Sequence, residues 1–556
     1  MTQIERVRKK AYVETYGCQM NVSDGELMQG ILAAGGYDIV AKPEDADVVL
    51  VNTCAIRDHA EQRVIGRVGE LYRLKTARPD MVIGVTGCMA QRLGERLLER
   101  AAYVDLVMGP DGYRGLTETL GRLRADHPGA TPGVAEAAQS RADQAGTSRM
   151  SGASVTPGES VTPGASVTPG ASVTPGASVT PGASMAPGPS SASARSPGGT
   201  TRRQLPVVGA DVAAAARADD RIAVLDFRED ENYEGLEMRR ASDITAWVPV
   251  QRGCNYRCTY CIVPYVRGPE KNRAAQRIID EVRSLADRGI TEVTLLGQTV
   301  NSWEHGDWRF PELLRAVARV DGIRRVRFTS PHPNDFTADL VEVMASEPNV
   351  CRQLHLPVQS GHNRTLKRML RRYTVEEYLE RVAMVRAAVP GIALSTDIIV
   401  AFPDETDEEY EATLDLVREV RYDDAFLYKY SPREGTPATR LPEGQFVAAD
   451  VAQERLERLI DLHREIQAEI NAAEVGSTVE VLVERAARSQ GDMLGRTGSY
   501  KVVAFPGDES LIGRYLHVRL TGTTGATFRG VAVDGPGGVA DASNGATTER
   551  GITRVA

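Results

Sequence analysis

Three cysteines on one short segment are the residues of this sequence with the clearest chemical meaning. Cys254, Cys258 and Cys261 lie in the run WVPVQRGCNYRCTYCIVPYVRG, directly after a predicted strand. Thiolate is the soft ligand that iron-sulfur clusters use, and three thiolates on one loop can hold three irons of a 4Fe-4S cube. The remaining iron is then open. The spacing therefore predicts a cluster that binds a further ligand at one iron.

Two other metal chemistries also use grouped cysteines. A structural zinc site needs four ligands and usually a second CxxC pair, but no such pair follows Cys261. A ferredoxin-like electron carrier needs a fourth cysteine close by. Both alternatives fit less well than an open cluster that chelates S-adenosylmethionine (SAM) and reduces it to release a 5′-deoxyadenosyl radical.

A second set of three cysteines is spread over the first part of the chain. Cys18, Cys54 and Cys88 each follow a predicted strand, in VETYGC, VVLVNTC and VIGVTGC. Parallel strands of a doubly wound sheet end at one edge, so we expect the three thiols to converge and hold a second 4Fe-4S cluster. Ordinary burial is the alternative, and it would place cysteines inside strands and helices. Cys351 has no cysteine neighbour and is interpreted as a packing residue.

The elements that must position these cysteines follow from hydrophobic periodicity. Alternating strand-like and helical runs over residues 11–110 predict a doubly wound parallel sheet. Six strand-helix units between Asp243 and Ile470 predict a partial (βα) barrel resembling a TIM barrel. Short alternating strands follow and predict a small all-β barrel. The expected domains are 1–125 (N-terminal), 126–204 (linker), 240–470 (barrel), 474–535 (all-β) and 536–556 (tail).

The linker and the overall composition restrict the function. Six successive hexads of the SVTPGA type run from Ser154 to Pro189, and their Pro and Gly content predicts a disordered segment. No apolar run is long enough to span a bilayer, and no export signal precedes the first strand, so we expect a cytoplasmic protein. The formal net charge is −9, which means that a nucleic acid would have to be bound by local basic patches.

Taken together, these features resemble a known family. The cysteine loop resembles the signature of the radical SAM superfamily, and the last domain resembles the TRAM RNA-binding module. With the second cysteine set, the chain is similar to the radical SAM methylthiotransferases. Its stretches TYGCQMN, VNTCAIRDHAEQRV, GVTGCMAQR and YVDLVMGP resemble the MiaB-type branch, which acts on isopentenyladenosine in tRNA, whereas the ribosomal-protein branch usually reads GCPKN in place of GCQMN.

The resemblance implies a reaction and its partners. Isopentenyladenosine at position 37, in the anticodon loop of tRNA, would receive a 2-methylthio group, with one SAM methylating sulfur and another producing the radical. Two 4Fe-4S clusters, an electron donor such as flavodoxin or ferredoxin, and a sulfur or cluster donor are implied for a protein that we expect to be monomeric. The alternatives are a methylthiotransferase for threonylcarbamoyladenosine or a ribosomal-protein aspartate, and, from another class, a noncatalytic RNA-binding protein with structural metal.

Motifs such as LLGQTVNSW, RFTSPHP, HLPVQSGHNRTLKRM and STDIIVAFPDET suggest the residues that contact SAM or the adenine. Each lies at or beyond the end of a predicted barrel strand, where such folds bind ligands. Arg267 could pair with a carboxylate of SAM. In the family, glycines are common where this sequence has Ala401 and Asp404, so that turn departs from the pattern. The expected contacts are Arg267, Gln298, Ser330, Gln359, Ser360 and Asp397.

Two groups of basic residues are the predicted RNA contacts. The segment RTLKRMLRR has five cations and no acidic residue of its own, so a phosphate-binding surface and a solvated helix face are equally consistent with it. In the all-β domain an aromatic residue beside basic residues near a turn is suited to an unpaired RNA loop. The predicted contacts are Arg364, Lys367, Arg368, Arg371, Arg372, Arg496, Tyr500 and Lys501.

Overall fold

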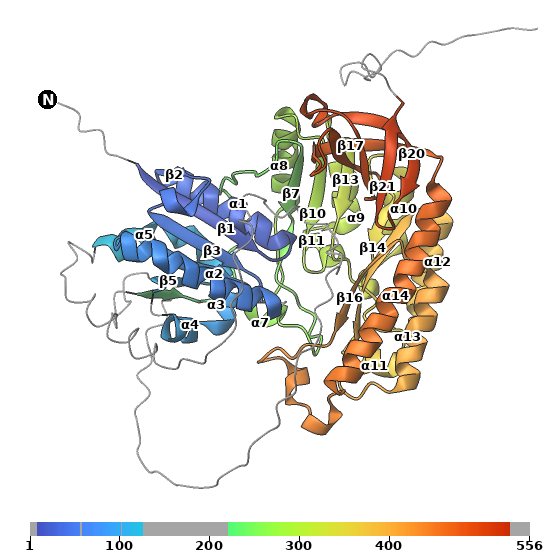
Figure 1. Ribbon diagram of the computed structural model, residues 1–556, viewed down its shortest axis with the longest axis horizontal. Helices are drawn as coiled ribbons and strands as arrows, with labels where there is room; N and C mark the ends of the chain where they lie inside the picture. Colours follow the sequence, from blue (N-terminus) through green and yellow to red (C-terminus); the bar gives the residue numbers. More distant parts are fainter. Residues whose placement is uncertain (1–7, 56–57, 102, 126–220, 534–556) are drawn as a thin grey trace, which may run out of the picture.

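Three units, each with its own core, make up the part of the chain that the computed structural model describes, which is residues 8–55, 58–101, 103–125 and 221–533. They are a parallel α/β sheet domain, a partial (βα) barrel and a small closed β-barrel, in that order along the chain (Figure 1). This confirms the predicted fold class. The hexad repeats and the tail lie outside the described residues.

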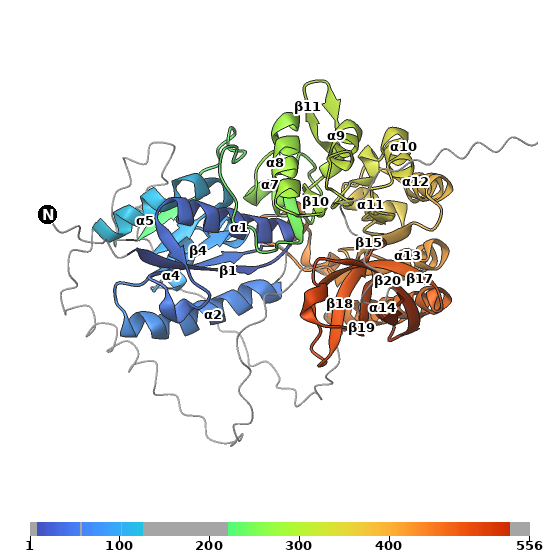
Figure 2. The same ribbon diagram turned by 90° about the horizontal axis from the view of Figure 1, so that it is seen from above.

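The N-terminal domain is built on a six-stranded parallel sheet with the order β2-β1-β3-β4-β5-β6. Strands β3 and β4 are buried along their whole length, which explains their nearly continuous apolar sequences. Helices α1 and α5 cover one face of the sheet, and α2, α3 and α4 cover the other (Figure 2). The elements are β1 (Lys9–Tyr16), α1 (Gln19–Ala34), β2 (Tyr37–Ile39), β3 (Val48–Thr53), α2 (Asp58–Ala77), β4 (Val82–Gly87), α3 (Cys88–Leu93), α4 (Glu95–Arg100), β5 (Leu106–Met108) and α5 (Leu116–Ala125).

The sixth strand of this sheet, β6 (Ile222–Val224), was not predicted. It pairs in parallel with β5, although residues 126–220 separate it from α5. The chain beyond β6 then runs along α1, where Arg240 forms an ion pair of 3.1 Å with the buried carboxylate of Glu26. The N-terminal domain therefore consists of two stretches of sequence, one on each side of residues 126–220.

The central domain is a partial barrel of six parallel strands. Strands β7, β10 and β13 form one sheet and β14, β15 and β16 another, and a parallel bridge between Val326 and Val350 joins them. One hydrophobic core fills the space between the strands and the outer helices, as in other (βα) barrels. All six predicted strand-helix units are present. The main elements are β7 (Thr245–Pro249), α7 (Val263–Val266), α8 (Ala275–Asp287), β10 (Glu292–Leu296), α9 (Phe310–Ala318), β13 (Arg325–Phe328), α10 (Ala338–Ser346), β14 (Gln353–His355), α11 (Asn363–Arg368), α12 (Val375–Ala388), β15 (Ala393–Val400), α13 (Asp407–Val420), β16 (Asp424–Lys429) and α14 (Ala449–Glu474).

The small C-terminal barrel is closed, with the strand order β17-β18-β19-β21-β20. In β20 the residues alternate between buried and exposed, as expected for a strand with one face on a core. Two short hairpin-like pairs, β8 with β9 and β11 with β12, decorate the central domain. The elements are β17 (Thr478–Ala486), β18 (Asp492–Thr497), β19 (Val502–Pro506), β20 (Tyr515–Thr523), β21 (Thr527–Ala532), β8 (Gln251–Arg252), β9 (Lys271–Asn272), β11 (Glu304–His305) and β12 (Trp308–Arg309).

Two buried arginines of β13 attach the small barrel to the central domain. Arg325 donates to the carbonyl oxygen of Arg496 at 2.9 Å, and Arg327 donates to that of Thr497 at 2.8 Å. Both arginines also form ion pairs with Glu292 at the start of β10. The small barrel thus packs on the amino ends of the strands, at the opposite end of the barrel from the cysteine loop (Figure 1).

Candidate active site

The three N-terminal cysteines follow three neighbouring strands of the first sheet. Cys18 precedes α1, Cys54 follows β3 directly, and Cys88 is the first residue of α3. Strands β1, β3 and β4 are adjacent and end in register, with Tyr16 opposite Thr53 and Thr53 opposite Gly87. The structure therefore brings the three cysteines to one edge of the sheet, because the strands that carry them stop at the same level.

Gly17 allows the first two of these cysteines to approach each other. Its φ is +140°, and a Cβ atom at this position would lie 2.6 Å from the Cβ of Cys54. A hydrogen bond between the thiols of Cys18 and Cys54 is the first cause that lowers the pKa of Cys18 to about 6, with the charge of Arg267 as a further cause. Cys18 is therefore disposed to be a thiolate, the form that binds iron.

Arg267 lies at this first cysteine set. Its Nε–H donates to the Sγ of Cys88 at 3.2 Å, and its Nη2 forms an ion pair of 2.7 Å with Asp24 of α1. Desolvation raises the pKa of Cys88, and the nearby guanidinium opposes this rise. The contacts of Arg267 in the structure are thus with the N-terminal domain, and its pairing with a carboxylate of SAM stays a prediction.

The second set occupies the loop between β8 and α7. The N–H of Cys261 donates to the carbonyl oxygen of Cys258 at 3.0 Å, and that of Cys254 donates to Gly268 at 3.1 Å, so the loop is folded back on itself. Burial raises the pKa of Cys254 to about 11 and that of Cys261 to about 12, with the neighbouring Cys258 contributing. A metal that binds here must therefore displace protons from the thiols.

The two cysteine sets lie on either side of one contact between domains. Helix α7, which follows the loop, packs against α3. Cys88 shares a small buried apolar cluster with Ala55, Ile262 and Val266. The residue after Cys261 therefore belongs to the same buried cluster as a cysteine of the other set.

The donor chemistry of both sites suits a 4Fe-4S cluster with one open iron. Each offers three thiols, and the described residues contain no group of three His, Cys, Asp or Glu side chains arranged for a single metal ion. At the first site, the buried Nη1 of Arg267 has no hydrogen-bond partner within the described part of the chain, so an acceptor such as a cluster sulfur fits there. Cys351 lies elsewhere, beside Arg327 at the other end of the barrel.

Four of the six predicted contacts to SAM or adenine, Gln298, Ser330, Gln359 and Ser360, follow the carboxyl ends of barrel strands. Ser330 and Gln359 follow strand ends and have φ of +58° and +73°, a strained conformation that clusters at functional sites. Ser360 is fully buried, and the buried Oε1 of Gln298 has no hydrogen-bond partner among the described residues. Asp397 lies inside β15 instead of after it.

Sequence reasoning missed two residues around Asp397. His355 of β14 places its Nε2 3.6 Å from the Asp397 carboxylate, and its Nδ1 lies 3.0 Å from the Oγ of Ser395. The exposed ring of Phe426 packs edge-on against His355, with ring centroids 5.7 Å apart. The alternation of residues along a strand could have placed these side chains on one face, but not the pairing between strands.

The basic run from Arg364 to Arg372 does have acidic partners, which come from a distant part of the sequence. Arg364 and Arg368 both form ion pairs with Asp404 and with the buried Glu409 of α13. The acidic partners of these two residues thus lie outside the run, and their role in binding RNA stays a prediction. Lys367 and Arg372 are exposed, whereas Arg371 turns inward toward the cysteine loop.

The predicted RNA contacts of the small barrel are used largely for packing. Tyr500 is held between the guanidinium groups of Arg327 and Arg496, 4.8 and 4.4 Å from its ring centroid. Lys501 forms an ion pair of 2.7 Å with Asp423 of the central domain. These side chains therefore hold the small barrel against the central domain, and their role in binding RNA stays a prediction.

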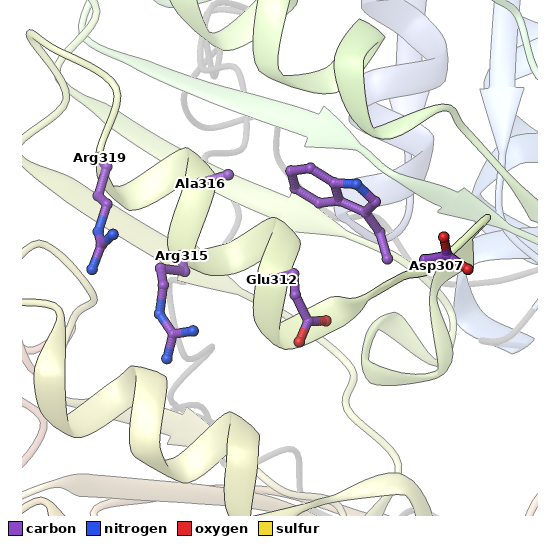
Figure 3. A pocket seen from close by; sticks show the side chains of 6 residues that line it. Asp307, Glu312, Arg315, Ala316 and Arg319 are labelled. Carbon is purple, nitrogen blue, oxygen red and sulfur yellow. The ribbon is translucent and has the colours of Figure 1, made fainter.

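A shallow pocket of about 340 Å³ lies outside this region. It is formed by α9 and the β11–β12 hairpin and contains Trp308, Glu312 and Arg315 (Figure 3). None of the six clustered cysteines lines it. We therefore place the chemistry at the cysteines and not in this pocket.

The departures from the family pattern at Ala401 and Asp404 have a structural cost. Both residues adopt positive φ, +57° and +66°, where glycine would be unstrained. For Ala401 the left-handed conformation costs about 1–2 kcal/mol, and glycine would lose roughly 0.5–1 kcal/mol to chain entropy.

We expect Ala401→Gly to stabilise the central domain by roughly 0.5–1 kcal/mol, because relief of strain exceeds the entropy loss. Thermal unfolding followed by circular dichroism would show a higher midpoint. Ala438→Gly is the control, since Ala438 is equally buried and has no positive φ; it should lower the midpoint. A lower midpoint for both variants would contradict the strain argument.

Comparison with known proteins gives the same division of the chain. Residues 10–109 match the Uncharacterized protein family UPF0004, residues 248–417 the radical SAM superfamily, and residues 472–533 the TRAM domain. A tRNA-2-methylthio-N(6)-dimethylallyladenosine synthase from Moorella thermoacetica is 39% identical over 95% of this chain and 100% of its own length. One from Phocaeicola vulgatus is 38% identical over 94% and 96%.

The solved structures that resemble this chain are more distant. The radical S-adenosylmethionine methyltransferase TsrM from Kitasatospora setae, with tryptophan substrate and a SAM analog bound, superposes with a TM-score of 0.49. It is 14% identical, and the match covers 83% of this chain and 89% of TsrM. Among the described helices, none has the length and apolar character needed to cross a membrane.

Proposed function

This chain belongs to the family of the tRNA-2-methylthio-N(6)-dimethylallyladenosine synthases, and we propose that it adds a methylthio group to carbon 2 of N6-isopentenyladenosine in tRNA. The observation that carries this proposal is the packing of α7, which follows the barrel loop with Cys254, Cys258 and Cys261, against α3, which begins at Cys88 of the N-terminal set. A radical enzyme needs one such set, and the insertion of sulfur explains the other.

We propose that each set holds one 4Fe-4S cluster. Cys254, Cys258 and Cys261 would bind the cluster of the barrel, which supplies an electron for the cleavage of SAM. The N-terminal set, Cys18, Cys54 and Cys88, would bind the cluster that carries sulfur. The protein residues around them hold the ligands in place and restrict the access of water, because four of the six cysteines are buried and the other two are partly buried.

The carboxyl ends of the barrel strands would hold SAM and the target base. Gln298 contributes a buried acceptor that has no hydrogen-bond partner in the described part of the chain, and the strained backbones at Ser330 and Gln359 fix the direction of neighbouring groups. Phe426 presents an exposed ring on which an adenine could stack. The proposed reaction also requires an electron donor, such as flavodoxin or ferredoxin, and a sulfur or cluster donor. We place it in the cytoplasm, where tRNA is present.

The direct test is reconstitution. Reduced protein with both clusters rebuilt, incubated with SAM and isopentenylated tRNA, should yield the 2-methylthio nucleoside in digests analysed by mass spectrometry. The same tRNA without the isopentenyl group serves as the control and should yield much less product. Release of 5′-deoxyadenosine with no methylthio nucleoside in either tRNA would refute the proposed reaction.

For the RNA, we propose the outer face of the small barrel. The exposed arginines Arg485, Arg519 and Arg529 form no ion pair with any residue of the described ranges. Arg519 lies opposite Val531 in the β20–β21 pair, and Arg529 is two residues from Val531 on the same strand. These two cations therefore share one outward face of neighbouring strands, where a phosphate backbone would be attracted.

We expect the double variant Arg519→Glu and Arg529→Glu to weaken tRNA binding by roughly tenfold or more. The slope of log K against the logarithm of the salt concentration should become shallower by about 0.7–0.9 for each phosphate contact that is lost. Filter binding at several salt concentrations would measure both. Arg458→Glu is the matched control, because Arg458 is exposed but already paired with Glu411. Equal loss in the double variant and the control would indicate a general charge effect and contradict the proposed surface.

A further inference from the structure

Each cysteine set receives a hydrogen bond from one arginine that reaches it from another segment. The Nε–H of Arg267 donates to the Sγ of Cys88 at 3.2 Å. An Nη1–H of Arg371 donates to the Sγ of Cys258 at 3.4 Å. Sequence reasoning assigned Arg267 to SAM and Arg371 to RNA, but in the structure both side chains point at sulfur.

Both guanidinium groups are fixed by further contacts. Arg267 is buried and forms an ion pair with Asp24, which in turn is 3.2 Å from Arg252. Arg371 donates to the hydroxyl of Tyr373 at 3.0 Å and to the carbonyl oxygen of Pro357 at 3.2 Å. Neither side chain can move away from its sulfur without losing these hydrogen bonds and ion pairs. The fold therefore fixes both arginine–sulfur contacts.

The two arginines differ in how their charge is balanced. Arg267 and Arg252 share the single carboxylate of Asp24, so one positive charge remains in excess in this buried group. Arg371 has no carboxylate partner among the described residues, and its other contacts are neutral. A largely buried cation without a counter-charge is costly. Cysteine thiolates and the sulfides of a cluster would supply the missing negative charge at both places.

A positive group beside a cluster has a further effect. Reduction adds one negative charge to the cluster, and hydrogen bonds and cations at its sulfurs stabilise that charge. Resting on the two-cluster function proposed above, we infer that Arg267 and Arg371 are positioning residues, each of which raises the reduction potential of the cluster bound to the cysteine set that it contacts.

The experiment measures one cluster at a time in the full-length chain. Two triple variants serve as the parent proteins. In the first parent, Cys254, Cys258 and Cys261 are replaced by alanine, so that only the N-terminal cysteine set remains. In the second parent, Cys18, Cys54 and Cys88 are replaced by alanine, so that only the barrel set remains. Iron content and the electron paramagnetic resonance signal of each parent test the two-cluster proposal first. A parent that binds no cluster refutes that proposal and, with it, the role of the arginine for that set.

Redox titration followed by electron paramagnetic resonance then tests the arginines. Arg371→Gln is made in the second parent, which retains the barrel set, and Arg267→Gln in the first, which retains the N-terminal set. Each substitution should lower the equilibrium constant for reduction of the remaining cluster about tenfold, which is a shift of about 59 mV to lower potential for one electron. The lysine variants, which keep the charge, should recover most of the shift. Unchanged potentials in the glutamine variants would overturn the inference.

Two further variants separate electrostatics from loosening of the structure. Asp24→Asn removes the negative charge beside Arg267 and should move the potential of the N-terminal cluster upward, opposite to Arg267→Gln. Arg455→Gln removes a buried arginine that pairs with Glu405 and has no hydrogen bond or ion pair with a cysteine among the described residues, so it should leave both potentials unchanged. Shifts of the same sign in Asp24→Asn and Arg267→Gln would overturn the inference.

Discussion

Cys54→Ala is expected to abolish methylthio transfer, by more than roughly 100-fold, while SAM cleavage continues. Cys54 lies at the end of β3, between Cys18 and Cys88 on neighbouring strands, so its loss removes the central ligand of the N-terminal set. The loop with Cys254, Cys258 and Cys261 is held by its own hydrogen bonds and should stay intact. Liquid chromatography of the products would quantify 5′-deoxyadenosine and the 2-methylthio nucleoside in the same reaction, and bound iron should fall by about half if each set holds one cluster.

Cys351→Ala is the matched control for this variant. Cys351 is also buried, but it lies beside Arg327 at the end of the barrel that carries the small β-barrel. Both products should form at the rate of the unaltered protein. If Cys54→Ala reduced deoxyadenosine and methylthio nucleoside equally, the two cysteine sets would not have separate roles.

Gly253→Ala, unlike Cys54→Ala, should reduce SAM cleavage itself, by roughly 100-fold or more, and the methylthio nucleoside should be lost as a consequence. Gly253 has a φ of +77°, and a Cβ atom there would lie only 1.9 Å from the carbonyl oxygen of Pro269. Because the obstacle is backbone, the loop itself must move, and Cys254 next to it would move too. The assay is the rate of 5′-deoxyadenosine release by the reduced protein without tRNA.

Gly289→Ala controls for backbone strain alone. Gly289 has a φ of +89°, close to that of Gly253, but a Cβ atom there would meet nothing within 4 Å. It should cost about 1–2 kcal/mol in stability and leave SAM cleavage intact. Similar losses of cleavage in the two variants would show that strain, and not the position of the cysteine loop, determines the effect.

The sequence was sufficient to predict features that depend on local pattern. Periodicity located all six strands of the barrel, and the position of Cys18, Cys54 and Cys88 after three strands predicted their approach, since strands of a parallel sheet end together. The family resemblance marked Ala401 as a departure from a turn in which glycine is common, and the positive φ of Ala401 belongs to that turn.

The features that the sequence did not reveal depend on contacts between distant segments. The basic run containing Arg364 contains no acid, and its partner Glu409 lies on a later helix. Arg371 belongs to the same run, but its side chain turns inward and contacts Cys258. The pattern of charges along the sequence does not distinguish such an arginine from one that is exposed to solvent. Strand β6 has only three residues, too few for periodicity to detect, and it is held in place by its neighbour β5.

The interrupted N-terminal domain separates the two sets of cysteines in an experimentally useful way. Cys18, Cys54 and Cys88 precede residues 126–220, and Cys254, Cys258 and Cys261 follow them, while β6 and the Arg240–Glu26 ion pair join the later stretch to the earlier one. A protein expressed as two polypeptides, divided within 126–220, would carry one set on each piece and still have a shared sheet with which to reassemble. Each cluster could then be built with a different iron isotope, so that spectroscopy could follow the two clusters separately during a single turnover.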